Sequence, residues 1–148
     1  MIKANELRIG NWVSIPECGI VSSIKTIDSK RFAINIDNVD LSPGEDIFNY
    51  ESAIGIPLTP EILEKCGFEQ LPHFTVQNNW FKKIGRDRVV SVACVGTPNE
   101  MVFINEEVPP EVKNIIVARN YDYDGKTYLH QLQNLIFALT GEELTVNL

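Results

Sequence analysis

The feature that most constrains the fold is the stretch 128–140, YLHQLQNLIFALT, which is followed by Gly141. At 100° per residue, its apolar side chains fall on one side of a helix and its polar side chains on the other. The apolar side contains Tyr128, Leu129, Leu132, Leu135, Ile136 and Leu139. Glycine is favoured immediately after a helix, where the backbone turns left-handed. The sequence therefore predicts a long amphipathic helix over 128–140, with part of a sheet packed against its apolar side.

The first part of the chain has the pattern of short β-strands. Residues 12–15, 20–27 and 31–36 are rich in β-branched and aromatic side chains, and turn residues separate them. In the last stretch apolar side chains occur at every second position, which is the period of a strand with one buried face. Short, bent strands bury little as a flat sheet, so we expect a small SH3-like β-barrel over residues 1–56.

A short helix opens the second part of the chain. Thr59 is placed to accept a hydrogen bond from the first turn, Pro60 suits the first helical position and Gly67 follows the last turn. These signals predict a helix over 60–66.

The rest of the second part, 57–148, has the pattern of a β-meander followed by the long helix. Strands within about 74–118 are joined by short turns, so neighbouring strands must be antiparallel. A meander with a helix across one face is an α+β arrangement. We therefore predict an α+β fold, in which an SH3-like barrel subdomain over 1–56 and an α+β subdomain over 57–148 pack as one unit.

Composition limits the environment and the partners of the chain. Its formal net charge of −7 opposes non-specific binding to phosphate backbones, which needs a basic surface. No stretch approaches the roughly 20 apolar residues of a membrane span, and no leader sequence is recognised. The three cysteines, Cys18, Cys66 and Cys94, lie far apart without a C-x-x-C pair, which predicts neither a disulfide framework nor a zinc site. We expect a cytoplasmic protein that does not bind membranes.

The polar side of the long helix presents His130 and Asn134 one turn apart, with Gln131 beside them. One interpretation makes them a recognition face for a protein partner, because amides and an imidazole donate and accept hydrogen bonds. The alternative is a polar face that is solvated or that caps a sheet. Phe137 lies on the same side, where an aromatic ring gains nothing from water. It therefore either lies under the other half of the chain or belongs to an interaction patch.

The stretch WFKKIGRDR, residues 80–88, is the strongest nucleic-acid candidate. Its turn residues predict a hairpin, and basic charge beside stacking aromatic rings is what single strands bind. The candidate contacts are Trp80, Phe81, Lys82, Lys83, Arg86 and Arg88. The alternative is an ordinary hairpin whose lysines protect an exposed strand.

No motif in the sequence supports metal binding or catalysis. Asn120, Asp122, Asp124 and Gly125 match the first half of a calcium loop, but its twelfth position is Gln131, where a bidentate glutamate is needed. No nucleophile elbow, zinc-protease helix or phosphate-binding glycine loop occurs. A pair of carboxylates brought together by folding is the remaining enzymatic alternative. We predict a protein without metal, cofactor or enzymatic activity.

Three stretches together resemble a known family. They are ANELRIGNWV near the start, IPLTPEILEKCGFE in the middle and YLHQLQNLIFALTGEEL near the end. They are similar to stretches in short uncharacterised proteins of gut bacteria, often encoded near phage genes or mobile elements. That family has no assigned activity, so the resemblance implies only a bacterial or phage cytoplasmic protein. We predict an accessory protein that acts as a non-enzymatic protein-interaction module, with nucleic-acid binding through residues 80–88 as the alternative.

Overall fold

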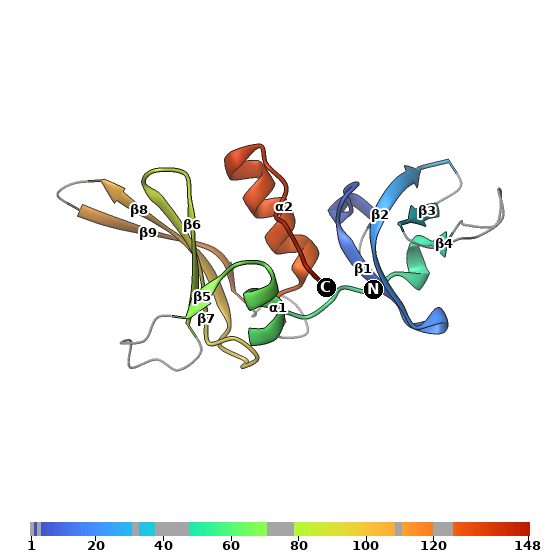
Figure 1. Cartoon of the computed structure of the whole chain (residues 1–148), viewed down its shortest axis with the longest axis horizontal. Coiled ribbons are helices and arrows are strands. Elements are labelled where there is room, and N and C mark those ends of the chain that lie inside the picture. The colour runs from blue at the N-terminus through green and yellow to red at the C-terminus, as the bar shows by residue number, and fades with distance from the viewer. Residues whose placement is uncertain are drawn as a thin grey trace. The chain divides into compact units, whose positions relative to one another are not determined.

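The computed structural model describes residues 2, 4–30, 33–37, 48–70, 79–108, 111–119 and 126–148. The predicted α+β class is confirmed, with two antiparallel sheets and a long helix near the end of the sequence (Figure 1). The chain divides into two compact units. Unit 1 comprises Met1–Ile56 and Tyr128–Leu135, and unit 2 comprises Pro57–Thr127 and Ile136–Leu148. In the described ranges, no helix has the length and apolar character needed to cross a membrane.

Unit 1 is built on a four-stranded antiparallel sheet with the strand order β1-β2-β3-β4. Its elements, in which η marks a 3-10 helix, are η1 (Ala4–Glu6), β1 (Trp12–Ile15), η2 (Pro16–Cys18), β2 (Ile20–Asp28), β3 (Ala33–Ile36), β4 (Phe48–Asn49) and η3 (Tyr50–Ser52). The first three strands match the stretches that the apolar pattern predicts, although β2 continues one residue further, to Asp28, and residues 31–32 lie outside the described residues. The fourth is a two-residue strand paired with β3.

The sheet of unit 1 curls into a half-barrel. The register of β2 against β3 shifts between Ile24 and Thr26, and such a bulge bends a strand. After η3 the chain returns to β1, where Ser14 and Ile54 exchange backbone hydrogen bonds of 3.0 and 2.9 Å. The interior is filled by buried aliphatic side chains, among them Val13, Ile15, Ile24, Ile34 and Ile36.

Unit 2 contains a five-stranded antiparallel meander with the order β5-β6-β7-β8-β9. Its elements are α1 (Pro60–Lys65), β5 (Glu69–Gln70), β6 (Trp80–Ile84), β7 (Arg88–Ala93), β8 (Met101–Val108), β9 (Glu111–Arg119) and the second half of α2 (Leu129–Thr140). Strands β6 to β9 pair consecutively, as the short turns predict, and β5, which the sequence did not predict, pairs with β6. Within the strand region predicted from the sequence, residues 74–78 and 109–110 lie outside the described residues.

The helix ends follow their sequence signals. The Thr59 hydroxyl accepts a 3.3 Å hydrogen bond from the N–H of Ile62, which caps α1. Gly67, after α1, and Gly141, after α2, both have a φ of 74°. The N–H of Gly141 donates a 2.8 Å hydrogen bond to the carbonyl of Phe137, which closes the last turn of α2.

Helix α2 belongs to both units, which the sequence did not predict. The sequence placed all of 128–140 in the second subdomain, whereas Tyr128–Leu135 belongs to unit 1. The physical reason is that polar side chains of this half bind backbone groups near the start of the chain, such as those of Trp12 and Glu6. Packing of the two subdomains as one unit stays a prediction.

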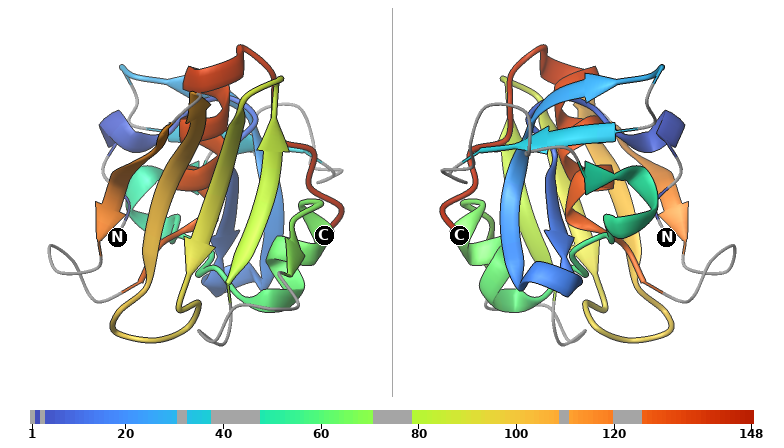
Figure 2. Two further views of the ribbon diagram at one scale, coloured as in Figure 1. Left: turned by 90° about the vertical axis from the view of Figure 1, so that its left-hand side faces the viewer. Right: turned by 90° about the vertical axis from the view of Figure 1, so that its right-hand side faces the viewer.

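The sheet of unit 2 has a covered face and an outer face. Side chains alternate along β6, so Trp80 and Ile84 point to one face while Phe81 and Lys83 point to the other. Ile84 lines a pocket together with Leu139 of α2, so its face is the one that the end of α2 covers. In the left panel of Figure 2 the strands of this sheet lie in front of the end of α2, the part that belongs to unit 2. Buried side chains of the covered face are Trp80, Ile84, Val90, Val92, Val102 and Ile104.

Candidate functional site

The polar side of α2 is used within unit 1. Gln133 is 1% exposed, and its side-chain amide continues the hydrogen-bond ladder of β1. Its Oε1 accepts a 2.8 Å bond from the N–H of Trp12, and its Nε2 donates a 3.0 Å bond to the carbonyl of Gly10. Gln133 therefore pairs backbone groups at the edge of β1 in the way that a neighbouring strand would.

Asn134 binds the segment that precedes β1. Its Nδ2 donates a 2.7 Å hydrogen bond to the carbonyl of Glu6. Its Oδ1 accepts bonds from Asn11 Nδ2 at 2.9 Å and from Arg8 Nε at 3.1 Å. These contacts match the sheet-capping interpretation, and they occupy the groups that a recognition face would present to a partner.

His130 is buried, with 1% of its surface exposed. Its ring stacks on Tyr128 with centroids 5.9 Å apart, and its Nε2 lies 3.6 Å from Glu6 Oε2. Neither ring nitrogen has a hydrogen-bond partner in the described part of the chain. Burial lowers the pKa of His130 because an imidazolium loses its hydration, and the Glu6 carboxylate opposes this shift. The fold therefore favours the neutral imidazole.

Acidification is expected to destabilise the protein through His130. Because folding lowers the pKa of His130, the unfolded chain binds a proton at this residue more tightly than the folded protein does. The contribution of His130 to stability is therefore complete above the unfolded-state pKa of about 6.5, and it is lost as the pH falls below that value. One proton limits the slope to about 1.4 kcal/mol per pH unit. Urea denaturation at roughly pH 7.5, 6.5 and 5.5 measures this slope.

The control for this pH effect is His130→Gln, which removes the titrating ring. Its stability should change less than that of the wild type over the same pH range. Equal slopes in the two proteins would show that other groups set the pH dependence.

The other two predicted partner-binding residues have different surroundings. Gln131 Oε1 accepts a 3.1 Å hydrogen bond from the N–H of Tyr128, so it caps the first turn of α2. Phe137 is 38% exposed and belongs to unit 2, whereas His130, Gln131 and Asn134 belong to unit 1. The four residues therefore do not form one surface within either unit.

The predicted hairpin over residues 80–88 is formed by β6, β7 and the turn 85–87. Two of its six nucleic-acid candidates are used for packing within unit 2. Trp80 is 9% exposed on the covered face. Lys82 Nζ donates a 2.7 Å hydrogen bond to the carbonyl of Cys66 and lies 5.9 Å from the centroid of the Phe68 ring. Neither side chain is presented for stacking or for a phosphate.

The other four candidates lie in two places. Phe81 and Lys83 are on the outer face, where Phe81 is half-buried and Lys83 is exposed. Arg86 and Arg88 are exposed at the tip of the hairpin. The structure thus does not join the six residues into one basic and aromatic surface.

The outer face carries a row of side chains with an aromatic ring at each end, Phe81, Ser91 and Phe103, which the sequence did not predict. Phe81 on β6 pairs with Ser91 on β7, and Ser91 pairs with Phe103 on β8. Both rings are half-buried, while Ser91 between them is 6% exposed. Met101 precedes Phe103 by two positions on the same strand and is also half-buried. Alternation in β8 is the only sequence signal that puts Phe103 on this face. The strand register that aligns Phe103 with Ser91 and Phe81 depends on contacts between strands far apart in the sequence.

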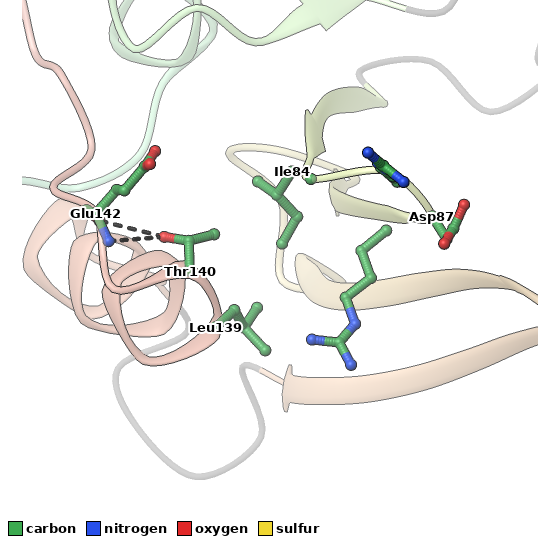
Figure 3. Close-up of a pocket in the computed structure, with 8 residues that line it drawn as sticks. Ile84, Asp87, Leu139, Thr140 and Glu142 are labelled. Atoms are coloured by element: carbon green, nitrogen blue, oxygen red, sulfur yellow. Dashed lines mark hydrogen bonds between the residues drawn. The ribbon is translucent and has the colours of Figure 1, made fainter.

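A pocket of about 490 Å³ lies between the hairpin tip and the end of α2, within unit 2. Figure 3 shows Ile84 and Leu139 reaching toward this space, with Glu142 at the helix end and Asp87 on the far side of the hairpin. The lining residues are Ile84, Gly85, Arg86, Asp87, Arg88, Leu139, Thr140 and Glu142. The pocket therefore combines an apolar floor with charges of both signs.

Comparison with known protein families, curated proteins and solved structures found no match to this chain. Its function must therefore be argued from the geometry of the two units.

Metal binding needs clustered ligands, and nucleophilic chemistry at a cysteine needs an ionised thiol. Within the described ranges, no three histidine, cysteine, aspartate or glutamate side chains come together as metal ligands. The half calcium motif at 120–125 lies outside those ranges. Burial raises the pKa of the Cys66 thiol to about 11, so this cysteine is protonated at neutral pH and is a poor nucleophile. Glu100 is 2% exposed, and its two oxygens accept 2.8 Å bonds from the N–H groups of Gly96 and Thr127, which is a structural use.

Proposed function

We propose that the protein is a non-enzymatic protein-interaction module that binds its partner through the outer face of the unit 2 sheet. The observation that carries the proposal is the row Phe81, Ser91 and Phe103, in which two half-buried rings flank a small side chain. The resemblance to proteins of gut bacteria and their phages supports a role as a bacterial or phage accessory protein, acting in the cytoplasm.

The composition of the outer face fits a partner with an apolar surface and a polar rim. Aromatic residues and methionine are enriched in protein interfaces, and Met101 adds to the row. Ser91 between the rings is 6% exposed and accepts a 3.2 Å hydrogen bond from Asn105 Nδ2, so the two rings are the larger apolar surfaces that this row offers to a partner. Lys83 is exposed two positions after Phe81 on the same face and Glu69 pairs with Phe81, so the rim beside the rings carries charges of both signs.

We also propose that the half-barrel of unit 1 is SH3-like. In support, four short strands follow one another in sheet order, the 3-10 helix η3 comes next, and Ile54 then returns to β1. This return brings the last part of the barrel back to its first strand, which leaves only a short open edge. Gln133 covers part of that edge.

Nucleic-acid binding is the second candidate, because Phe81 and Lys83 share the outer face and an aromatic ring beside a cation is what bases and phosphates bind. The charges on this face favour a protein instead. Glu69 on β5 is exposed and pairs with Phe81, so it would stand close to any phosphate that Lys83 attracted. The net charge of −7 adds a general repulsion.

Replacing Phe103 with serine is expected to abolish partner capture. The tagged protein is incubated with a nuclease-treated gut-bacterial lysate, and a captured protein is then purified and titrated against each variant by calorimetry. Loss of an aromatic anchor should weaken binding at least about tenfold. The matched control is Phe137→Ser, since Phe137 is an exposed phenylalanine of α2 and does not belong to the outer face.

Three results decide between the candidates. A partner lost with Phe103→Ser and kept with Phe137→Ser supports the outer face. A partner lost only with Phe137→Ser moves the site to α2 and contradicts the proposal. Capture from a parallel lysate without nuclease that is absent from the nuclease-treated lysate, together with a salt-sensitive gel shift abolished by Lys83→Glu, favours the nucleic-acid alternative.

A further inference from the structure

The pocket beside the hairpin tip holds opposite charges on its two sides. Arg86 comes from the hairpin and Glu142 follows the end of α2, and both side chains are exposed. Neither side chain has a hydrogen-bond or ion-pair partner within the part of the chain that the structure describes. Both charged groups therefore line the pocket with hydrogen-bonding capacity that a ligand could use.

The end of α2 adds to the negative side of the pocket. The carbonyls of a last helical turn lack intrahelical donors, and the helix dipole places roughly half a negative charge there. The Gly141 N–H satisfies the carbonyl of Phe137, one turn back, and not those that follow it. Asp87, the other carboxylate in the lining, lies on the side of the hairpin away from α2 (Figure 3). With Arg86 and Arg88 against Asp87, the hairpin side of the pocket carries a net positive charge, and the helix end with Glu142 is the anionic side.

The floor between these two sides is apolar. Ile84 is 6% exposed on the covered face of the sheet, and Leu139 of α2 is half-buried opposite it. The volume of about 490 Å³ lies in the range of small-molecule sites, about 300–1,000 Å³. A cationic side, an anionic side and an apolar floor together define a ligand with a carboxylate, an ammonium group and a hydrocarbon side chain.

We propose that this pocket, between Arg86 and Glu142 over Ile84 and Leu139, binds a zwitterionic amino acid with an aliphatic side chain. The ligand carboxylate pairs with the guanidinium of Arg86, and its ammonium group pairs with Glu142 and the helix end. Its side chain lies against Ile84 and Leu139. This site is on the α2 side of unit 2, so it is separate from the outer face proposed for a protein partner.

L-leucine and two analogues test the pocket by removing one charge at a time. The full-length, isotope-labelled protein is titrated with L-leucine, with N-acetyl-leucine, which lacks the ammonium group, and with leucinamide, which lacks the carboxylate. Saturable shifts of the amide signals of Gly85 and Thr140 are expected with L-leucine, and at least about tenfold weaker binding is expected with each analogue.

Variants of the two charged residues complete the test. Arg86→Gln and Glu142→Gln should each weaken leucine binding, while Lys65→Gln and Glu64→Gln, exposed on α1 and absent from the lining, should leave it unchanged. The proposal is overturned if L-leucine produces no saturable shift, or if N-acetyl-leucine binds as tightly as leucine. In either case, partner capture through Phe103 would be unaffected, so the two proposals fail separately.

Discussion

Replacing Gly55 with alanine is expected to lower the free energy of unfolding by about 3 kcal/mol, which is a large overpacking cost. A Cβ at position 55 would stand 2.5 Å from Cδ1 and 2.6 Å from Cγ of Tyr128, and 3.1 Å from Cε1 of His130. Gly55 and His130 are both buried, and the ring of Tyr128 stacks on His130. The added methyl group therefore forces the Tyr128 ring, and with it the ring pair, away from position 55 at the start of α2. Urea denaturation followed by circular dichroism measures the change.

Two comparisons separate this clash from a general intolerance of glycine replacement. Gly96→Ala meets no atom within 4 Å, so it should cost only the left-handed backbone strain, about 1 kcal/mol. In a Tyr128→Ala background, Gly55→Ala should lower the free energy of unfolding by less than it does in the wild type, because the closest clashing atoms are gone. A cost for Gly55→Ala no greater than that for Gly96→Ala would mean that Tyr128 yields easily.

Features with local causes could be predicted from the sequence. The end of α2 is set by Gly141, and the hairpin by the turn after Ile84, each of which acts within a few residues. The alternation of apolar residues in β3 depends only on the strand period. Such signals place the elements and give the α+β class without any knowledge of tertiary contacts.

The use of the polar helix side could not be predicted in the same way. Amphipathicity shows that Gln133 and Asn134 avoid the apolar core, but it does not distinguish water from a backbone group as their partner. Their actual partners are separated from them by 121 residues for Trp12 and by 128 for Glu6. The pairing of Phe81 with Ser91 and Phe103 likewise depends on strand register, which is fixed by the whole sheet. Candidate sites were missed where long-range contacts decide them.

Replacing Gln133 with leucine is expected to cost about 3 kcal/mol, because each buried backbone group left without a partner costs about 1–3 kcal/mol. Leucine has a similar size and suits a helix, so the change removes the amide without opening a large cavity. The groups left unpaired are the N–H of Trp12 and the carbonyl of Gly10. Urea denaturation measures the cost, and hydrogen exchange should show the Trp12 amide losing its protection.

Gln131→Leu is the matched control, since Gln131 lies two residues earlier on α2 and its side chain accepts one hydrogen bond, from the Tyr128 N–H. Losing that cap should cost about 1 kcal/mol and should leave exchange at Trp12 unchanged. Gln133→Glu keeps the size of the side chain but replaces the donor toward Gly10 with a buried charge, so its cost should exceed that of leucine at neutral pH and decrease on acidification. If leucine at position 133 costs no more than leucine at position 131, the edge of β1 does not depend on the amide of Gln133.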